Sequence, residues 1–196
     1  RSDFYIQKNL IDAVKKHKKL QELVIVSGAH LSKKYGFTFN EVKTYNYKII
    51  AKIKNLIITD KLDSRLQGLS NQLRKLISVV IKHKPDFIIA PYDREEALTM
   101  AITGTYLNIP VVHLGAGDRT RVNVDGIVRH SVSKLSHLFF TFSEENKNRL
   151  IKLGEQEWRI FNVGHTSRER FNYTKEIKIS KLSKYNNIKI EKKYFI

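Results

Sequence analysis

The chain has 196 residues, enough to bury one full hydrophobic core, and its content of 41% hydrophobic and 10% aromatic residues is typical of a folded globular protein. It contains no cysteine, which excludes a disulfide framework and a thiolate metal site, and no apolar run approaches the roughly 20 residues of a membrane helix. No signal-peptide pattern follows Arg1, so we expect a cytoplasmic protein.

The net charge is +17, from 36 basic and 19 acidic residues. A polyanionic partner is one interpretation of this charge. We favour another, in which single lysines cover solvated helix faces, because the densest basic stretch, residues 175–193, lacks the alternation of arginine and aromatic residues found in nucleic-acid grooves. We therefore expect no nucleic acid and no membrane as partners, although a basic surface would attract an anionic small molecule.

The order of apolar runs predicts an α/β protein. In the first half of the chain, the pattern predicts a helix over residues 2–19 and two or three strands, over residues 22–27, 48–52 and 56–58. It also predicts a long amphipathic helix over residues 60–84, and it leaves residues 29–46 irregular. Strands over residues 87–90, 111–114, 138–142 and 159–163 then alternate with helices that begin at residues 95, 125 and 143. Wholly apolar strands that alternate with helices indicate a Rossmann-like, doubly wound parallel sheet.

Both ends of this pattern are expected to be truncated. The first helix has no strand before it, although such domains normally open on a strand, and Lys192-Lys-Tyr-Phe-Ile196 resembles the beginning of another strand. We expect residues 1–171 to form a Rossmann-like domain without its first strand. Residues 172–196 are expected to be a linker and the start of a truncated second domain.

Polar residues accumulate where the predicted strands end. The carboxyl ends of parallel strands meet at one edge of a sheet, so the segments 1–3, 91–94 and 113–125 are expected to converge. They would bring together carboxylates, a histidine and arginines: Asp93, Asp118, Asp125, His130, Arg1, Arg94 and Arg119. Carboxylates near a histidine can move a proton, and arginines bind phosphates through two hydrogen bonds. The residues thus indicate a site for an anionic small molecule; no spacing suggests a metal site.

Several of these residues also have structural interpretations, which the sequence leaves open. Asp125 is equally placed to cap a helix, and Asp93 to form a local pair with Arg94. His113 ends a strand, where its ring can bond to the backbone alone, and His137 is interpreted as structural.

Several motifs resemble the UDP-N-acetylglucosamine 2-epimerases, and most of all the hydrolysing type that begins the synthesis of sialic-acid-like sugars. One is Asp125-Gly-Ile-Val-Arg-His130, which continues to His137. The others lie in residues 1–3, 27–36, 84–94, 107–113, 143–145 and 162–164. The resemblance covers nearly the whole chain.

The resemblance implies the N-terminal half of a two-domain, glycosyltransferase-B-like fold that binds a UDP-sugar between its domains. The implied reaction removes the proton at sugar C2 and eliminates UDP, then adds water or UDP with the opposite configuration at C2. It needs no cofactor. The resemblance leads us to expect a homo-oligomer at full length, and no activity from this piece alone, because the second domain is needed to bind UDP.

The same resemblance assigns roles to individual residues. Asp93 matches the aspartate of a Gly-Asp-Arg motif, and Asp125, Arg129 and His130 match an Asp-Glu-Ser-Ile-Arg-His motif. It implies a catalytic set of Asp93, Asp118, Asp125 and His130, and a substrate-binding set of Arg1, Arg94, His113 and Arg129.

Three departures from the family pattern bear on activity. Where the family reads His-Ile-Glu-Gly-Gly-Glu, this chain has Gly115 in place of the first glutamate and Asp118 in place of the second, and Gly126 replaces a third. Loss of a general base typically removes a factor of about 10²–10⁴ in rate. Either Asp118 and Asp125 take over, or the substrate or step differs. The run from Ala116 to Thr120 also resembles the non-hydrolysing type. A glycosyltransferase and a non-catalytic sugar-nucleotide binder are the alternative functions.

Overall fold

The computed structural model describes residues 4–59, 61, 63–120 and 124–166, which form an α/β fold. The first half contains α1 (Phe4–Lys16), β1 (Val24–Ser27), two 3₁₀ turns (Gly28–Leu31 and Lys33–Tyr35), α2 (Phe39–Thr44), β2 (Ile49–Ile53) and α3 (Ser64–His83). The second half contains β3 (Ile88–Pro91), α4 (Glu95–Tyr106), β4 (Val111–Leu114), α5 (Asp125–Lys134), β5 (Leu138–Thr141), α6 (Glu144–Lys152), a 3₁₀ turn (Glu157–Arg159) and β6 (Ile160–Asn162).

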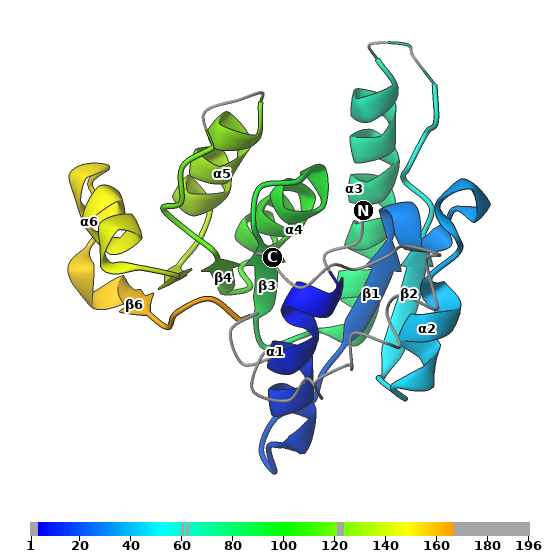
Figure 1. Cartoon of the computed structure of the whole chain (residues 1–196), viewed down its shortest axis with the longest axis horizontal. Helices are drawn as coiled ribbons and strands as arrows, with labels where there is room; N and C mark the ends of the chain where they lie inside the picture. Colours follow the sequence, from blue (N-terminus) through cyan, green and yellow to red (C-terminus); the bar gives the residue numbers. More distant parts are fainter. Residues whose placement is uncertain (1–3, 60, 62, 121–123, 167–196) are drawn as a thin grey trace, which may run out of the picture.

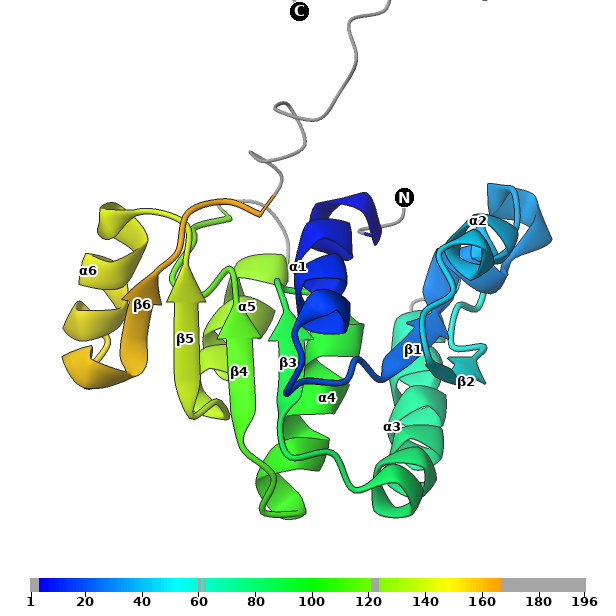
Figure 2. The ribbon, with the colours of Figure 1, turned by 90° about the horizontal axis from the view of Figure 1, so that it is seen from below.

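All strand pairs among these residues are parallel, which confirms the predicted fold class. The strands form a pair, β1–β2, and a larger sheet in the order β3-β4-β5-β6. The pair lies beyond β3, at the end of the larger sheet (Figures 1 and 2). Helix α1 covers one face, and α3, α4 and α5 cover the other (Figure 2).

The register of the larger sheet aligns the ends of its strands. Ala90 of β3 lies opposite His113 of β4, which lies opposite Phe139 of β5. The chain therefore leaves β3, β4 and β5 at the same edge. This alignment places the segments after Pro91, Leu114 and Thr141 beside one another, as expected for ligand-binding loops of a parallel sheet.

The core of the larger sheet is built from small and β-branched residues. All four residues of β4 are buried, as expected for a central strand covered on both faces. One cluster joins β3 and β4 to α4 and α5, and it consists of Ala90, Ala97, Ala101, Val111 and Val132. Alanines on α4 allow this helix to lie close to the sheet, and so fix the start of α4 beside the end of β3.

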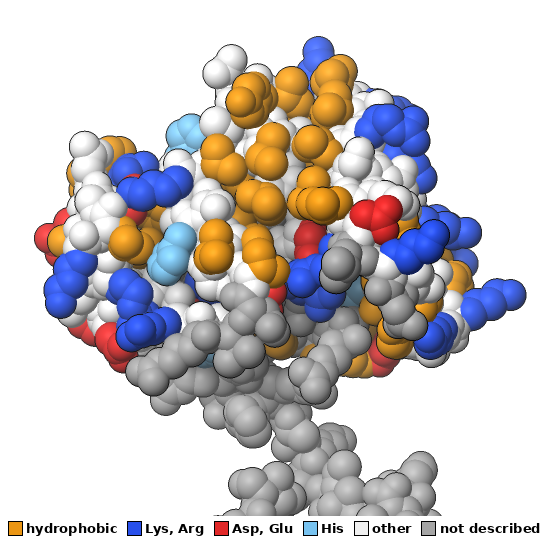
Figure 3. All heavy atoms as spheres, turned by 90° about the horizontal axis from the view of Figure 1, so that it is seen from above, with side chains coloured by type: hydrophobic (Ala, Val, Ile, Leu, Met, Phe, Trp, Pro, Cys, Tyr) orange, Lys and Arg blue, Asp and Glu red, His pale blue; other side chains and the backbone are white. Residues whose placement is uncertain are grey.

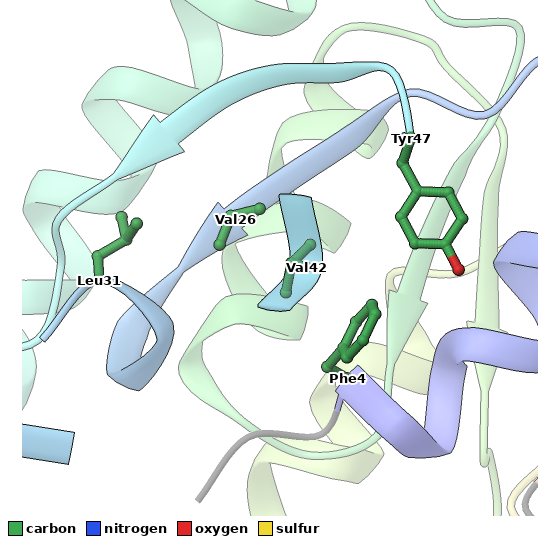
Figure 4. Close-up of a cluster of buried hydrophobic side chains, with 5 residues drawn as sticks. All are labelled: Phe4, Val26, Leu31, Val42 and Tyr47. Atoms are coloured by element: carbon green, nitrogen blue, oxygen red, sulfur yellow. The ribbon is translucent and has the colours of Figure 1, made fainter. Parts of the chain in front are cut away.

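A second core lies between α1, α2 and the β1–β2 pair. It consists of Phe4, Val26, Leu31, Val42 and Tyr47 (Figure 4). The Tyr47 hydroxyl donates a hydrogen bond to Asp12 of α1 at 2.5 Å. Burial and the neighbouring carboxylate raise the pKa of Tyr47 above its usual value. This cluster ties α1 to the first strand pair.

The first half of the chain differs from the sequence prediction in two places. The segment expected to be irregular contains α2, a six-residue helix too short to show a helical period. The strand candidate at residues 56–58 is not a strand, and its three side chains are exposed. Strand β2 ends at Ile53, and Asn55 then turns inward to accept a hydrogen bond from the Gly28 amide at 2.7 Å. The apolar run after Asn55 therefore has no strand to pair with.

Residues 2 and 3, where the first helix is predicted to begin, and the predicted domain boundary near residue 171 lie outside the described residues. Within the described residues, no helix combines the length and apolar character that crossing a membrane requires.

Candidate active site

Arg129 lies at the centre of the candidate site. It belongs to the buried face of α5, and its side chain is only 6% exposed. Its guanidinium donates hydrogen bonds to the Asp93 carboxylate and, at 2.8 Å, to the Gly115 carbonyl oxygen, and it lies 3.6 Å from Asp118. A buried cation needs such partners, because removal from water is costly. Arg129 thus draws together Asp93 after β3 and Asp118 after β4, as the sequence predicts.

The Asp93 loop is held in an uncommon backbone conformation. Tyr92 has φ 63°, in the left-handed region that side chains other than glycine seldom adopt. Its carbonyl oxygen accepts a hydrogen bond from His113 Nε2 at 2.8 Å. Thr120 Oγ1 lies 3.4 Å from Asp93 Oδ2 and donates to it. The Asp93 carboxylate is therefore oriented by contacts from two other segments.

His113 is fully buried and has both ring nitrogens engaged. Because the Tyr92 carbonyl can only accept, Nε2 carries the proton, and Nδ1 then accepts from the Ser133 hydroxyl at 2.9 Å. Burial lowers the pKa of His113 to about 4, and the positive charge of Arg129 adds to this effect. The structure therefore favours the backbone-bonding interpretation of His113, in which a neutral ring positions the Tyr92–Asp93 loop.

His130 follows Arg129 on α5 and differs from His113. Its Nδ1 atom is buried, and among the described residues it has no hydrogen-bond partner. Burial lowers the pKa of His130, and the charges of Arg129 and Arg149 lower it further. A histidine with a lowered pKa is neutral near pH 7 and can accept a proton. Its place in the site stays a prediction.

The remaining predicted residues are placed apart from this centre or outside the described residues. Asp125 is the first residue of α5 rather than its cap, which is Val124, and it lies 3.7 Å from Arg65. Arg94 is exposed, with Nε 3.5 Å from Glu96. The local Asp93–Arg94 pair is not formed, since Asp93 pairs with Arg129. Arg1 lies outside the described residues.

Four further side chains at this edge were missed from the sequence. The rings of Tyr92 and Phe142 are 5.9 Å apart, and the His165 ring lies 4.4 Å from Phe142. Arg149 donates to the Gly117 carbonyl oxygen and, at 2.5 Å, to Glu145 on the same helix. Only the spacing of Glu145 and Arg149, four residues apart, was visible in the sequence. In the described part of the chain, no cluster of three or more acidic or histidine side chains suits a metal ion.

Comparison with known proteins decides the family. The family model described as UDP-N-acetylglucosamine 2-epimerase matches residues 12–196, nearly the whole chain. The chain belongs to this family. One curated relative in this family is GDP/UDP-N,N'-diacetylbacillosamine 2-epimerase (hydrolyzing) from Campylobacter jejuni. It is 33% identical to this chain over all 196 residues, and the match covers 51% of the relative's length. Another is UDP-N,N'-diacetylbacillosamine 2-epimerase (hydrolyzing) from Legionella pneumophila, 35% identical over 84% of this chain and 43% of the relative.

Solved 2-epimerase structures share the fold. The UDP co-structure of S. aureus MnaA matches with a TM-score of 0.76 at 19% identity, over 93% of this chain and 48% of that one. UDP-GlcNAc 2-epimerase from Neisseria meningitidis, bound to UDP-GlcNAc, matches with a TM-score of 0.71 at 21% identity, over 88% of this chain and 47% of that one. The chain thus spans about half the length of the 2-epimerases that it matches.

Two glycines distinguish this member of the family from the family pattern, and neither site has room for a side chain. Gly115 has φ 77°, and a Cβ atom there would lie 2.9 Å from ring atoms of Tyr92 and Phe142. At Gly126, a Cβ atom would lie 2.7 Å from the Thr120 carbonyl oxygen. The positions of two family glutamates are thus closed by packing. The carboxylates that remain at the centre of the site are Asp93 and Asp118.

Proposed function

We propose that the full-length protein carrying this chain is a hydrolysing UDP-sugar 2-epimerase. A base removes the proton at sugar C2, the bond from C1 to the UDP oxygen breaks, and a glycal and UDP form. Water then adds to C1 while a proton returns to C2 on the opposite face, so that the free sugar has the inverted configuration at C2. Membership of the family and the names of the Campylobacter and Legionella relatives support this reaction.

One observation carries the proposal beyond family membership. Asp93 and Asp118 follow neighbouring strands and share the buried guanidinium of Arg129. The next residue, His130, has a buried ring nitrogen with no hydrogen-bond partner in the described part of the chain. Two carboxylates and a neutral histidine provide acids and bases for proton removal and return. We assign this role to Asp93, Asp118 and His130, with Asp125 as a further candidate. Arg129 orients the carboxylates, and His113 positions the loop.

The proposed substrate is a UDP-linked 2-acetamido sugar. The names of the relatives point to UDP-N,N'-diacetylbacillosamine, and the Neisseria structure holds UDP-GlcNAc. Arg94, exposed at the start of α4, and Arg1 are proposed to contact the uridine diphosphate, because arginine matches phosphate geometry. We further propose that the protein acts in the cytoplasm, as a homo-oligomer.

Asp93→Asn in the full-length protein tests the proposal. With UDP-N,N'-diacetylbacillosamine or UDP-GlcNAc as substrate, we expect the rate of UDP release to fall by about 10²–10⁴-fold, because an amide cannot exchange a proton as a carboxylate does. The amide still accepts a hydrogen bond from Arg129, so circular dichroism should show a folded protein. Asp86→Asn, at the exposed opposite end of β3, is the matched control and should retain wild-type turnover. Wild-type turnover by the Asp93→Asn variant would contradict the proposal.

A second candidate is a non-catalytic sugar-nucleotide binder. The closed positions at Gly115 and Gly126 favour it, because two family carboxylates are absent. It predicts that the wild-type protein binds the UDP-sugar, measured by calorimetry, while UDP release stays at the uncatalysed rate.

A further inference from the structure

Three aromatic rings lie together at the functional edge of the larger sheet. Tyr92 follows β3, Phe142 follows β5 and His165 follows β6. The ring centroids of Tyr92 and Phe142 are 5.9 Å apart, and the His165 ring lies 4.4 Å from that of Phe142. All three side chains are half-buried. We call the ring pair of Tyr92 and Phe142 the aromatic wall.

The aromatic wall lies directly over Gly115. A Cβ atom on Gly115 would lie 2.9 Å from an atom of each ring. The Gly115 carbonyl oxygen accepts a hydrogen bond from Arg129 at 2.8 Å, and the same guanidinium binds the Asp93 carboxylate. Tyr92 also immediately precedes Asp93. The wall is therefore beside the carboxylate to which the proposed function assigns proton transfer at C2.

Tyr92 occupies a position that suits glycine. Its φ of 63° lies in the left-handed region, which glycine adopts without steric cost. Glycine stands at this position in the Gly-Asp-Arg motif that Asp93 matches, and Gly115 stands where the family pattern has glutamate. The two departures from the pattern touch each other, since the Tyr92 ring fills the space beside Gly115. An unfavourable backbone conformation beside a candidate site points to a role for the side chain that is held there.

Neighbouring segments hold the aromatic wall in place before a ligand binds. The Tyr92 hydroxyl lies 3.4 Å from Thr166 Oγ1, and the side-chain amide of Asn9 on α1 donates a hydrogen bond to the Thr166 carbonyl oxygen at 3.3 Å. The segment that carries Thr166 runs from β6 towards α1 (Figure 2). Side chains that are already ordered lose little conformational freedom on binding, so their contacts contribute more to affinity.

The chemistry of the wall identifies the part of a ligand that it binds. The face of an aromatic ring packs against apolar groups, and small-molecule sites combine such rings with a few polar groups. A glutamate would offer a hydrogen bond to a sugar hydroxyl, whereas the face of a ring offers none. N,N'-Diacetylbacillosamine has a methyl group at C6 and an acetamido group at C4, where N-acetylglucosamine has a hydroxymethyl and a hydroxyl group. It is therefore the more apolar of the two sugars.

We propose that the aromatic wall contacts the sugar of the bound UDP-sugar and makes the site prefer N,N'-diacetylbacillosamine to N-acetylglucosamine. This preference rests on the proposed function, which supplies the UDP-sugar and the place of its C2 beside Asp93. Tyr92 and Phe142 are then specificity-determining residues. The loss of the glutamate at position 115 and the gain of a ring at position 92 are two parts of one change in substrate.

Tyr92→Gly in the full-length protein tests this inference. Binding is measured by calorimetry for UDP and for phosphonate analogues of both UDP-sugars, in which a CH₂ group replaces the oxygen on C1 so that UDP cannot leave. Glycine suits the backbone at position 92, so circular dichroism should show a folded variant. We expect the Kd of the bacillosamine analogue to rise at least about tenfold and its advantage over the glucosamine analogue to shrink. The Kd of UDP should stay unchanged, whereas a general disturbance of the site would weaken all three ligands.

Two further variants separate the ring from its hydroxyl group and from aromatic packing in general. Tyr92→Phe keeps the ring and should retain the preference of the wild type. Phe161→Ala is the matched control, because Phe161 forms a similar ring pair with Phe140, at 6.0 Å, one strand further along the sheet. It should leave all three Kd values unchanged.

The inference is overturned if Tyr92→Gly binds both analogues as the wild type does, if it weakens UDP equally, or if Phe161→Ala has the same effect. A wild type that binds neither analogue would overturn it together with the proposed substrate. UDP release from the natural UDP-sugars is a separate measurement. Binding with the expected preference but without UDP release would contradict the proposed reaction and leave the aromatic wall supported.

Discussion

Glycine and histidine shape the candidate site through packing and backbone contacts. Gly115 lets the chain turn with φ 77° where Tyr92 and Phe142 leave no room for a side chain. His113 holds the carbonyl of Tyr92 and is buried without charge. At the residue scale, the loop that carries Asp93 is therefore fixed by its neighbours before any substrate is bound.

Gly115→Ala tests this packing. The left-handed backbone costs an alanine about 1 kcal/mol, and contact with two rings adds about 1–3 kcal/mol. Gly154→Ala is the control, since Gly154 has φ 88° and nothing within 4 Å of its added Cβ. Urea unfolding should show that Gly115→Ala lowers the free energy of unfolding by about 1–3 kcal/mol more than Gly154→Ala does. Equal losses would show that the rings do not close the position.

His113 makes the stability depend on pH. Its pKa is about 4 in the folded protein against 6.5 when solvated, so below pH 6.5 the unfolded chain binds a proton that the folded protein does not. The contribution of the buried neutral His113 to the free energy of unfolding is complete above pH 6.5. About 3 kcal/mol of this free energy is lost as the pH falls towards 4. Chemical unfolding of wild type and His113→Gln between pH 4 and 7 should show a shallower pH dependence for the variant. Identical slopes would contradict the burial of a neutral ring.

At the scale of elements, α3 packs directly on the backbone after β2. A Cβ atom at Gly68 would lie 2.2 Å from the Asn55 carbonyl oxygen, closer than any real contact. In an open helix, replacing glycine by alanine gains about 1 kcal/mol. We expect Gly68→Ala to lower the melting temperature instead, because α3 must move away from Asn55. Ser78→Ala, at an exposed position of α3, is the control and should leave the melting temperature equal or slightly higher.

The sequence predicted the strands and helices of the second half of the chain within a few residues. Short β-branched runs bounded by glycine or polar residues are clear signals there. The helix predicted to begin at residue 143 is α6, and Ser143 caps it by accepting a hydrogen bond from the Asn146 amide at 3.2 Å. The run from Leu56 to Ile58 gives the same signal, yet it is no strand. Whether an apolar run pairs depends on the position of its neighbours in space, which a local pattern does not contain.

The sequence predicted residues of the candidate site but not the contacts among them. That Asp93 and Asp118 come together follows from strand order, because segments that leave parallel strands meet at one edge, whereas Arg129 was named only through the family resemblance. Arg129 bonds to carboxylates, and His113 bonds to a backbone carbonyl oxygen. Both contacts depend on side-chain directions inside the core. The closed position at Gly115 depends on rings contributed by two other segments.

At the scale of the whole molecule, the described residues form one α/β layer structure whose two sheet faces have different surroundings. The functional edge carries Asp93, Asp118 and Arg129. Helices α3, α4 and α5 expose large apolar side chains, among them Leu66, Tyr106 and Ile127, and Figure 3 shows hydrophobic side chains gathered in the middle of its view. The chain spans about half of its curated relatives, so the proposed reaction is that of the full-length protein. We propose that Asp93, Asp118 and His130 carry proton transfer at C2 in that protein, without the glutamate that Gly115 replaces.

The most direct test of this claim is solvent exchange at C2. The full-length protein is incubated in D₂O with UDP-N,N'-diacetylbacillosamine and, separately, with UDP-GlcNAc, and the products are followed by NMR. We predict deuterium at C2 of a free sugar with inverted configuration, together with released UDP, from at least one of the two substrates. Binding of both UDP-sugars without deuterium at C2 and without UDP release would contradict the claim.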